Sequence, residues 1–234
     1  MKRHFAEGIL EMMDRPDAHS DILEDDLRNL RIINRYFGGL SSLRKAVVPL
    51  GLKKSTAGPI AILDLATGSG DHPLSLVSAF RREGRRAHVT AVDRNEKMLR
   101  AARAYVGDAP EIQFDRQDIM NLPYEDNAFD IVTCSLAIHH FSGPDGVRLL
   151  REMNRLSRIG FVVNDLSRSL LGVASAWAYS RVTTRNPMTR YDSVLSVLRA
   201  YQKKEMNAMA VEAGVHPVRI YHVPFFRLIT VKEK

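Results

Sequence analysis

The chain has 234 residues, of which 45% are hydrophobic and 26% are charged, and its net charge is +7 at pH 7. This size and composition indicate one globular unit with a well-buried core and exclude a disordered chain. The sequence contains no run of 18 apolar residues that could span a membrane, and its single cysteine, Cys134, excludes an internal disulfide and a Cys-x-x-Cys metal site.

The positive charge leaves nucleic acid open as a partner. Lysine and arginine are spread along the chain, however, and the densest run, at residues 81–86, is typical of the end of a helix. The first residues become acidic before any long apolar stretch, so we expect no secretory signal and a cytoplasmic location.

Residues 5–50 are predicted to be helical, because apolar side chains such as Leu27, Leu30 and Ile33 recur every three or four positions. Gly38 and Gly39 interrupt this pattern, and residues 53–59 are predicted to be a linker.

From residue 60 onward, strand and helix patterns alternate. Strands are predicted at 60–65, 88–93, 111–115, 129–135 and 159–165, with helices at 73–83, 95–106 and 144–156. The remainder is predicted to form helices within 167–182 and 191–214, ending at Gly214, and strands at 219–223 and 226–230. Repeated strand–helix units predict a mainly parallel sheet with right-handed crossovers.

The first strand leads into a glycine-rich turn, Asp64 to Gly70, and then directly into a helix. Such a turn lets the backbone approach a nucleotide-like ligand and presents N–H groups at a helix start. Pro73 occupies the position of the third glycine of a dinucleotide fingerprint, which argues against NAD or FAD. No Gly-Lys-Ser/Thr follows, which argues against a Walker loop.

Two acidic residues follow the next strands. Asp93 ends the second strand, where a carboxylate can accept hydrogen bonds from both ribose hydroxyls, although it could also only cap the next helix. Asp118 follows the third strand and could accept a hydrogen bond from an adenine amine, with Ile119 packed on the purine.

Together, residues 60–73, AHVTAVD, FDRQDIMNLP and FDIVTCSLAIHHF resemble the class I S-adenosylmethionine-dependent methyltransferases over residues 60–165. Ala66 replaces the first glycine of that family's usual Gly-x-Gly-x-Gly. The resemblance implies an α/β, Rossmann-like fold with a seven-stranded, mainly parallel sheet and an antiparallel C-terminal strand. It also implies an N-terminal helical lid at 1–55 and one methyltransferase domain at 56–234.

The resemblance implies S-adenosylmethionine as cofactor, leaving S-adenosylhomocysteine as product. The cofactor-binding residues that it implies are Asp64, Ala66, Thr67, Gly68, Gly70, Asp93, Arg94, Met98, Asp118, Ile119, Ser135 and His140.

The tandem histidines follow the fourth strand, where the family places the methyl acceptor. We expect His140 to act as a general base and His139 to support it, with Asp165, at the end of the fifth strand, orienting a histidine. The alternative is that the histidines only shape the pocket. The sequence shows no carboxylate cluster beyond those assigned to the cofactor, so no metal is expected.

The acceptor site is expected to lie between the N-terminal lid and residues 166–200. Arg35 and Tyr36 are candidates to close over the cofactor, unless their helix is merely docked on the core. The opposite wall is predicted to be apolar and aromatic, with Leu170, Leu171, Val173, Trp177, Tyr179, Met188, Arg190 and Tyr191.

The residues after the fourth strand also exclude some chemistry. Enzymes of this class that methylate nucleobase or glutamine amines carry Asn/Asp-Pro-Pro-Tyr/Phe there, whereas this chain has residues 135–138 as Ser-Leu-Ala-Ile. Cys134 lies within an apolar strand and is predicted to be a core residue rather than a nucleophile.

Within the family, the chain resembles bacterial small-molecule methyltransferases related to quinone-biosynthesis enzymes. We therefore expect O-methylation of a phenol, quinol or polyketide-like acceptor by a monomer or homodimer that does not act on nucleic acid. The alternatives are C-methylation of an activated ring, methylation of RNA, and binding of S-adenosylmethionine without chemistry.

Overall fold

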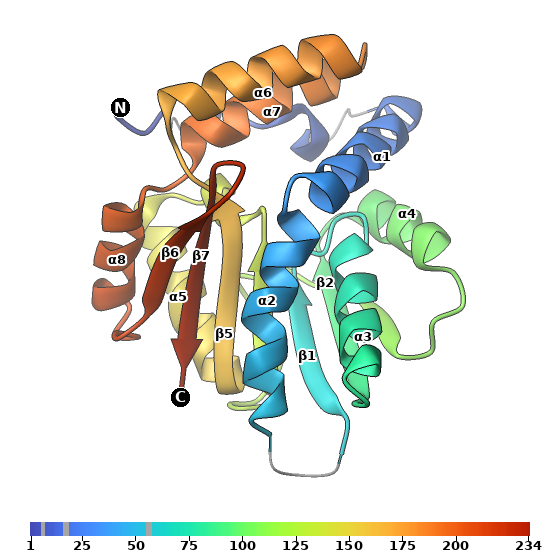
Figure 1. Cartoon of the computed structure of the whole chain (residues 1–234), viewed down its shortest axis with the longest axis vertical. Coiled ribbons are helices and arrows are strands. Elements are labelled where there is room, and N and C mark those ends of the chain that lie inside the picture. The colour runs from blue at the N-terminus through green and yellow to red at the C-terminus, as the bar shows by residue number, and fades with distance from the viewer. Residues whose placement is uncertain (6–7, 16–18, 55–57) are drawn as a thin grey trace.

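The computed structural model describes the chain except for residues 6–7, 16–18 and 55–57. Its centre is a seven-stranded sheet in the order β3-β2-β1-β4-β5-β7-β6 (Figure 1). The strands are β1 (Ile60–Leu65), β2 (Ala87–Asp93), β3 (Ile112–Arg116), β4 (Phe129–Ser135), β5 (Ser157–Leu166), β6 (Arg219–Val223) and β7 (Arg227–Glu233). Strands β1 to β5 pair in parallel, and β7 runs antiparallel to β5 and β6. The predicted fold class is therefore confirmed.

Helices cover both faces of the sheet and its carboxyl edge. They are α1 (Ser20–Tyr36), α2 (Gly39–Leu52), α3 (Asp71–Arg82), α4 (Glu96–Val106), α5 (Gly143–Leu156), α6 (Leu170–Thr183), α7 (Pro187–Arg199) and α8 (Lys203–Glu212), with short 3-10 turns η1 (Met12–Asp14) and η2 (Ile138–His140). The helices α2 and α3 pack against one face, and α5 and α8 pack against the other. Helices α1, α6 and α7 lie across the end of the sheet towards which β5 points (Figure 1).

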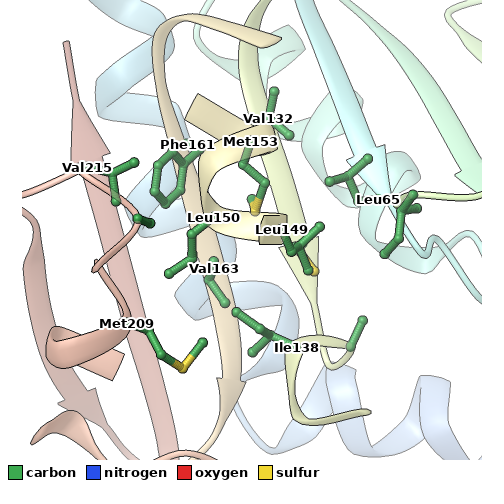
Figure 2. Packing of buried hydrophobic residues seen from close by; sticks show 14 of the residues in the cluster. Leu65, Val132, Ile138, Leu149, Leu150, Met153, Phe161, Val163, Met209 and Val215 are labelled. Atoms are coloured by element: carbon green, nitrogen blue, oxygen red, sulfur yellow. The ribbon is translucent and has the colours of Figure 1, made fainter. Parts of the chain in front are cut away.

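The core explains why the central strands read as continuous apolar runs. All seven residues of β4 are buried, because helices cover both of its faces. Figure 2 shows one side of this core, where Leu149, Leu150 and Met153 of α5 face Phe161 and Val163 of β5. This packing fixes where the strands end relative to the helices, and it therefore positions the loops that follow the strands.

Local signals in the sequence set the helix ends. The side chains of Asn95, Ser142 and Asn186 accept hydrogen bonds from the first turns of α4, α5 and α7. Gly214 adopts a left-handed conformation (φ 72°) just after α8, as predicted for a helix end.

The prediction of helix over residues 5–50 is wrong for its first part. Among the described residues before Ser20, only Met12–Asp14 form a helical turn, whereas α1 and α2 match the predicted pattern and its break near Gly38. The early segment instead runs along α7, where the Asp192 carboxylate accepts hydrogen bonds from the backbone of Met12 and Met13 at 2.7 and 3.0 Å. The backbone N–H groups of Met12 and Met13 are therefore satisfied without a long helix.

The division into a lid at 1–55 and a catalytic domain at 56–234 stays a prediction. Helix α2 packs on the sheet through Leu43, Val47 and Leu50, whereas α1 contacts α7 at the carboxyl edge. Within the part of the chain that the structure describes, no helix is both long and apolar enough to cross a membrane.

Candidate active site

A cavity of about 690 Å³ lies between the carboxyl ends of β1, β2 and β4 and the helices α1, α6 and α7. This volume is in the range of small-molecule and cofactor sites. The edge of an open α/β sheet where strand order reverses is also the usual ligand position in such folds. Here the order reverses between β1 and β4. The cavity therefore lies where the sequence places the cofactor.

The glycine-rich turn forms the floor of the cavity. Ala66, Gly68 and Gly70 all have positive φ (53°, 55° and 76°), a conformation that is costly for alanine and free for glycine. A Cβ on Gly68 would meet nothing within 4 Å, whereas one on Gly70 would meet Val106 and Ala102 of α4 at 3.0 and 3.1 Å. Gly68 therefore leaves space on the cavity side, and Gly70 allows the turn to pack against α4.

Asp93 is held rigidly at the end of β2. Its Oδ1 accepts a hydrogen bond from the Asn95 backbone at 2.9 Å, and its Oδ2 accepts one from the Gly68 backbone at 3.1 Å. Burial raises the pKa of this carboxyl, while the two N–H groups act in the opposite direction. Each oxygen keeps a lone pair for a further donor, so Asp93 can accept two more hydrogen bonds.

The predicted cofactor residues do not all reach the cavity. Those that line it are Ala66, Thr67, Gly68, Asp93, Arg94, Met98, Asp118, Ile119, Ser135 and His140. Gly70 lies under the turn. Asp64 is fully buried, where its Oδ1 accepts a hydrogen bond from the Thr133 hydroxyl at 2.6 Å and burial raises its pKa. Asp64 is thus placed to fix β1 against β4 beneath the site.

The loop after β4 brings the tandem histidines to Asp165. The His139 backbone donates to Asp165 Oδ2 at 3.1 Å, and its ring Nδ1 lies 2.7 Å from Oδ1. Burial would lower the pKa of His139, but Asp165 and Glu11 raise it to about 10. From the sequence, Asp165 is expected to orient one of the two histidines. In the structure it holds His139, the more buried of the two at 2% exposed.

His140 faces two carboxylates that sequence analysis missed. Its Nδ1 lies 2.8 Å from Asp14 Oδ2, and its Nε2 lies 3.8 Å from Glu11 Oε2. Glu11 is itself held by the Ser196 hydroxyl, which donates to Oε1 at 2.9 Å. Burial would raise the pKa of Glu11, but His140 and His139 hold it below its usual value. No local pattern marks Glu11 or Asp14, because the segment that carries them reaches the site through contacts with distant parts of the chain, such as α7 and the histidine loop.

Of the predicted wall residues after 165, Tyr179 lines the cavity, whereas Val173, Met188, Arg190 and Tyr191 do not. Ile33 and Asn34 of α1, and Phe37 just after it, line the cavity, whereas Arg35 and Tyr36 do not. From α6, the inward face is Gly172, Ser175, Ala176 and Tyr179. The predicted Leu170, Leu171 and Trp177 lie on the outer face and are 73%, 67% and 55% exposed. Helical periodicity separates these sets, but α6 is apolar nearly all round and its inner face could not be identified from the sequence.

The lining suits a polar nucleoside with a positive centre. The hydroxyls of Thr67 and Ser135 line the cavity, and that of Ser135 has no hydrogen-bond partner among the described residues. The carboxyl groups of Glu11, Asp14, Asp26, Asp93 and Asp192 also face it. A cavity with an unsatisfied hydroxyl, a fixed carboxylate at the end of β2 and an excess of acidic groups fits a sulfonium nucleoside such as S-adenosylmethionine.

The comparisons with known proteins agree with this geometry. A family model described as a methyltransferase domain matches residues 62–160. The demethylmenaquinone methyltransferase of Staphylococcus aureus is 31% identical over 126 residues, which are 54% of this chain and 48% of that protein. The chain thus spans about half the length of the curated relatives it matches.

Solved structures share the fold. An O-methyltransferase family protein from Burkholderia thailandensis is 11% identical with a TM-score of 0.66, over 95% of this chain and 61% of that one. An O-methyltransferase family 2 protein from Planctomyces limnophilus, solved in complex with apigenin, is 19% identical with a TM-score of 0.62, over 94% of this chain and 63% of that one.

Proposed function

Because this chain belongs to the class I S-adenosylmethionine-dependent methyltransferases, we propose that it methylates a hydroxyl group of a small aromatic acceptor such as a phenol, a quinol or a polyketide-like compound. The observation that carries the proposal is one cavity that joins the cofactor residues Gly68 and Asp93 to His140 and to an aromatic wall.

The cofactor supplies an activated methyl group, so the protein has mainly to hold and align the two reactants. Asp93 would accept hydrogen bonds from the ribose hydroxyls, and Gly68 would let the ligand approach the backbone. Ile119, which is 7% exposed, would pack on the adenine, with Asp118 at its amine. The acidic groups around the cavity would favour the positively charged sulfonium.

The acceptor half of the cavity supports an aromatic compound. Phe37 stands edge-on to Tyr179 at 4.9 Å and to Phe225 at 5.3 Å between ring centroids, and all three line the cavity. Edge-to-face packing of this kind can extend to one more ring. The small residues on the inner face of α6 leave room for it.

His140 would take the proton from the acceptor hydroxyl. A phenol has a pKa of about 10, so a nearby proton acceptor assists its ionisation, and imidazole is the side chain most often used for this. The His140 side chain is 20% exposed, in contrast to the 2% of His139, and Asp14 holds its Nδ1. His139 and Asp165 would then position the loop that carries the base.

Two measurements test this function. With a phenolic acceptor that the protein methylates, mass spectrometry and NMR of the product are expected to locate the new methyl group on oxygen. A methyl group on a ring carbon would support C-methylation instead.

His140→Gln is expected to lower kcat by about a hundredfold or more, as for loss of a general base, and to leave the Kd for S-adenosylhomocysteine unchanged. His222→Gln, on the exposed strand β6, is the matched control. Full turnover in His140→Gln would show that alignment alone drives the reaction.

A further inference from the structure

Glu11, near the start of the chain, converges at the cavity with the tandem histidines His139 and His140 from its middle. Glu11 Oε1 lies 3.4 Å from His139 Nε2, and Glu11 Oε2 lies 3.8 Å from His140 Nε2. One ligand atom from each of these residues lies within 4.8 Å of the others. All three residues line the cavity.

The outer nitrogens of both rings are already held by carboxylates. His139 Nδ1 lies 2.7 Å from Asp165, and His140 Nδ1 lies 2.8 Å from Asp14. A carboxylate accepts and does not donate, so each Nδ1 carries the hydrogen. The two Nε2 atoms therefore face the Glu11 carboxylate side of the cluster as potential ligand atoms. A positive charge among these groups stabilises them, and a metal ion would supply it in place of the second ring proton that Asp165 and Glu11 favour on His139.

A proton on His139 Nε2 makes only a long contact with Glu11. The distances from Glu11 to the two Nε2 atoms exceed those of good N–H···O hydrogen bonds. His139 Nε2 is buried in a side chain that is 2% exposed and has no hydrogen-bond partner among the described residues. Such an orphaned, enclosed nitrogen is costly unless something binds it.

A metal ion would fill it well. Tetrahedral ligands at about 2.1 Å from an ion lie about 3.4 Å from one another. The Glu11–His139 separation is 3.4 Å and the Glu11–His140 separation is 3.8 Å, so small side-chain shifts would complete the site. Metal-ligating histidines commonly donate their other ring N–H to a carboxylate, and here both do. Two imidazoles and one carboxylate favour transition metals such as zinc over magnesium or calcium.

We propose that Glu11, His139 and His140 form a binding site for one divalent transition-metal ion, with Asp165 and Asp14 holding the two rings. Three protein ligands leave a further coordination position, and the ligands line the cavity, so this position opens towards the acceptor. The site does not depend on which acceptor is methylated. A bound ion would turn His140 from a base into a ligand, and would itself favour ionisation of a coordinated hydroxyl.

Cobalt(II) is a suitable probe, because its visible absorption reports coordination number and ligand type. We would remove metals from the unsubstituted protein with a chelator and titrate it with Co²⁺. The expected result is saturation at one equivalent, with intense bands of a four- or five-coordinate ion that zinc then displaces. No saturable band, or a weak octahedral spectrum only, would overturn the proposal.

Matched variants locate the site. Glu11→Gln keeps the shape of the side chain and removes its charge, and it is expected to weaken Co²⁺ binding at least tenfold. Asp165→Asn is expected to weaken it about 10- to 100-fold, as for partners that orient metal-binding histidines. Glu24→Gln, exposed on α1, is expected to leave it unchanged. S-adenosylhomocysteine affinity checks that each variant folds, and His140→Asn replaces any that does not. Unchanged Co²⁺ binding in folded Glu11→Gln would refute the site, whatever the outcome for methyl transfer.

Discussion

Removal of the Asp93 carboxylate is expected to weaken cofactor binding by orders of magnitude. In the structure its two oxygens each accept one backbone hydrogen bond, from Asn95 and from Gly68, which leaves one lone pair on each for a ribose hydroxyl. A hydrogen bond to a charged group contributes about 1.5–3 kcal/mol, so two contribute about 3–6 kcal/mol. At about 1.4 kcal/mol per tenfold, Asp93→Ala should raise the Kd for S-adenosylhomocysteine about 10²- to 10⁴-fold.

Isothermal titration calorimetry with S-adenosylhomocysteine measures this directly. Asp93→Ala also releases the two N–H groups and loosens the turn, so Asp93→Asn is needed beside it. The asparagine keeps one accepting oxygen and should lose roughly half of that binding free energy. Asp108→Ala, in an exposed loop, is the control. If both Asp93 variants fold and bind within threefold of the unsubstituted protein, Asp93 does not hold the ribose.

The two glycines of the turn should respond differently to alanine. Gly70→Ala should lower the unfolding free energy by about 2 kcal/mol or more, because its backbone is left-handed and a Cβ would lie 3.1 Å from Ala102. Gly68→Ala should mainly weaken cofactor binding. Equal losses of unfolding free energy for the two variants in urea titrations would contradict this. Burial raises the pKa of Asp26 from 3.8 to about 6, so the folded state holds its proton more tightly. The resulting stability is complete below pH about 4 and is lost by pH about 6, a fall of about 3 kcal/mol. Asp26→Asn should remove this pH dependence and be more stable than the unsubstituted protein at pH 8; the same slope in both proteins would refute the assignment.

Local patterns sufficed for the sheet and for the floor of the site. The apolar runs of β1 and β4 and the Gly68–Gly70 turn carry their own structural signals, because strand burial and positive φ restrict the residue types directly. The carboxyl ends of parallel strands meet at one edge, so His139 and Asp165 could be expected to lie near one another from topology alone.

Contacts between segments that are far apart in the sequence could not be predicted, for a physical reason. Glu11 and Asp14 reach the histidines because Asp192 of α7 binds the backbone of Met12 and Met13, and no periodicity reports such a contact. The same holds for α6, whose inner face of small residues is distinguishable from its exposed leucines only once Tyr179 is seen against Phe37.

The central claim is that this protein transfers a methyl group from S-adenosylmethionine to a small aromatic acceptor. The most direct measurement incubates it with methyl-labelled S-adenosylmethionine and two pools, one of phenols, quinols and polyketide aromatics and one of tRNA and rRNA transcripts. We expect label in the small-molecule pool, lost in Asp93→Ala. Label in RNA alone would contradict this claim. It would indicate instead that the net charge of +7 reflects binding to a nucleic-acid substrate.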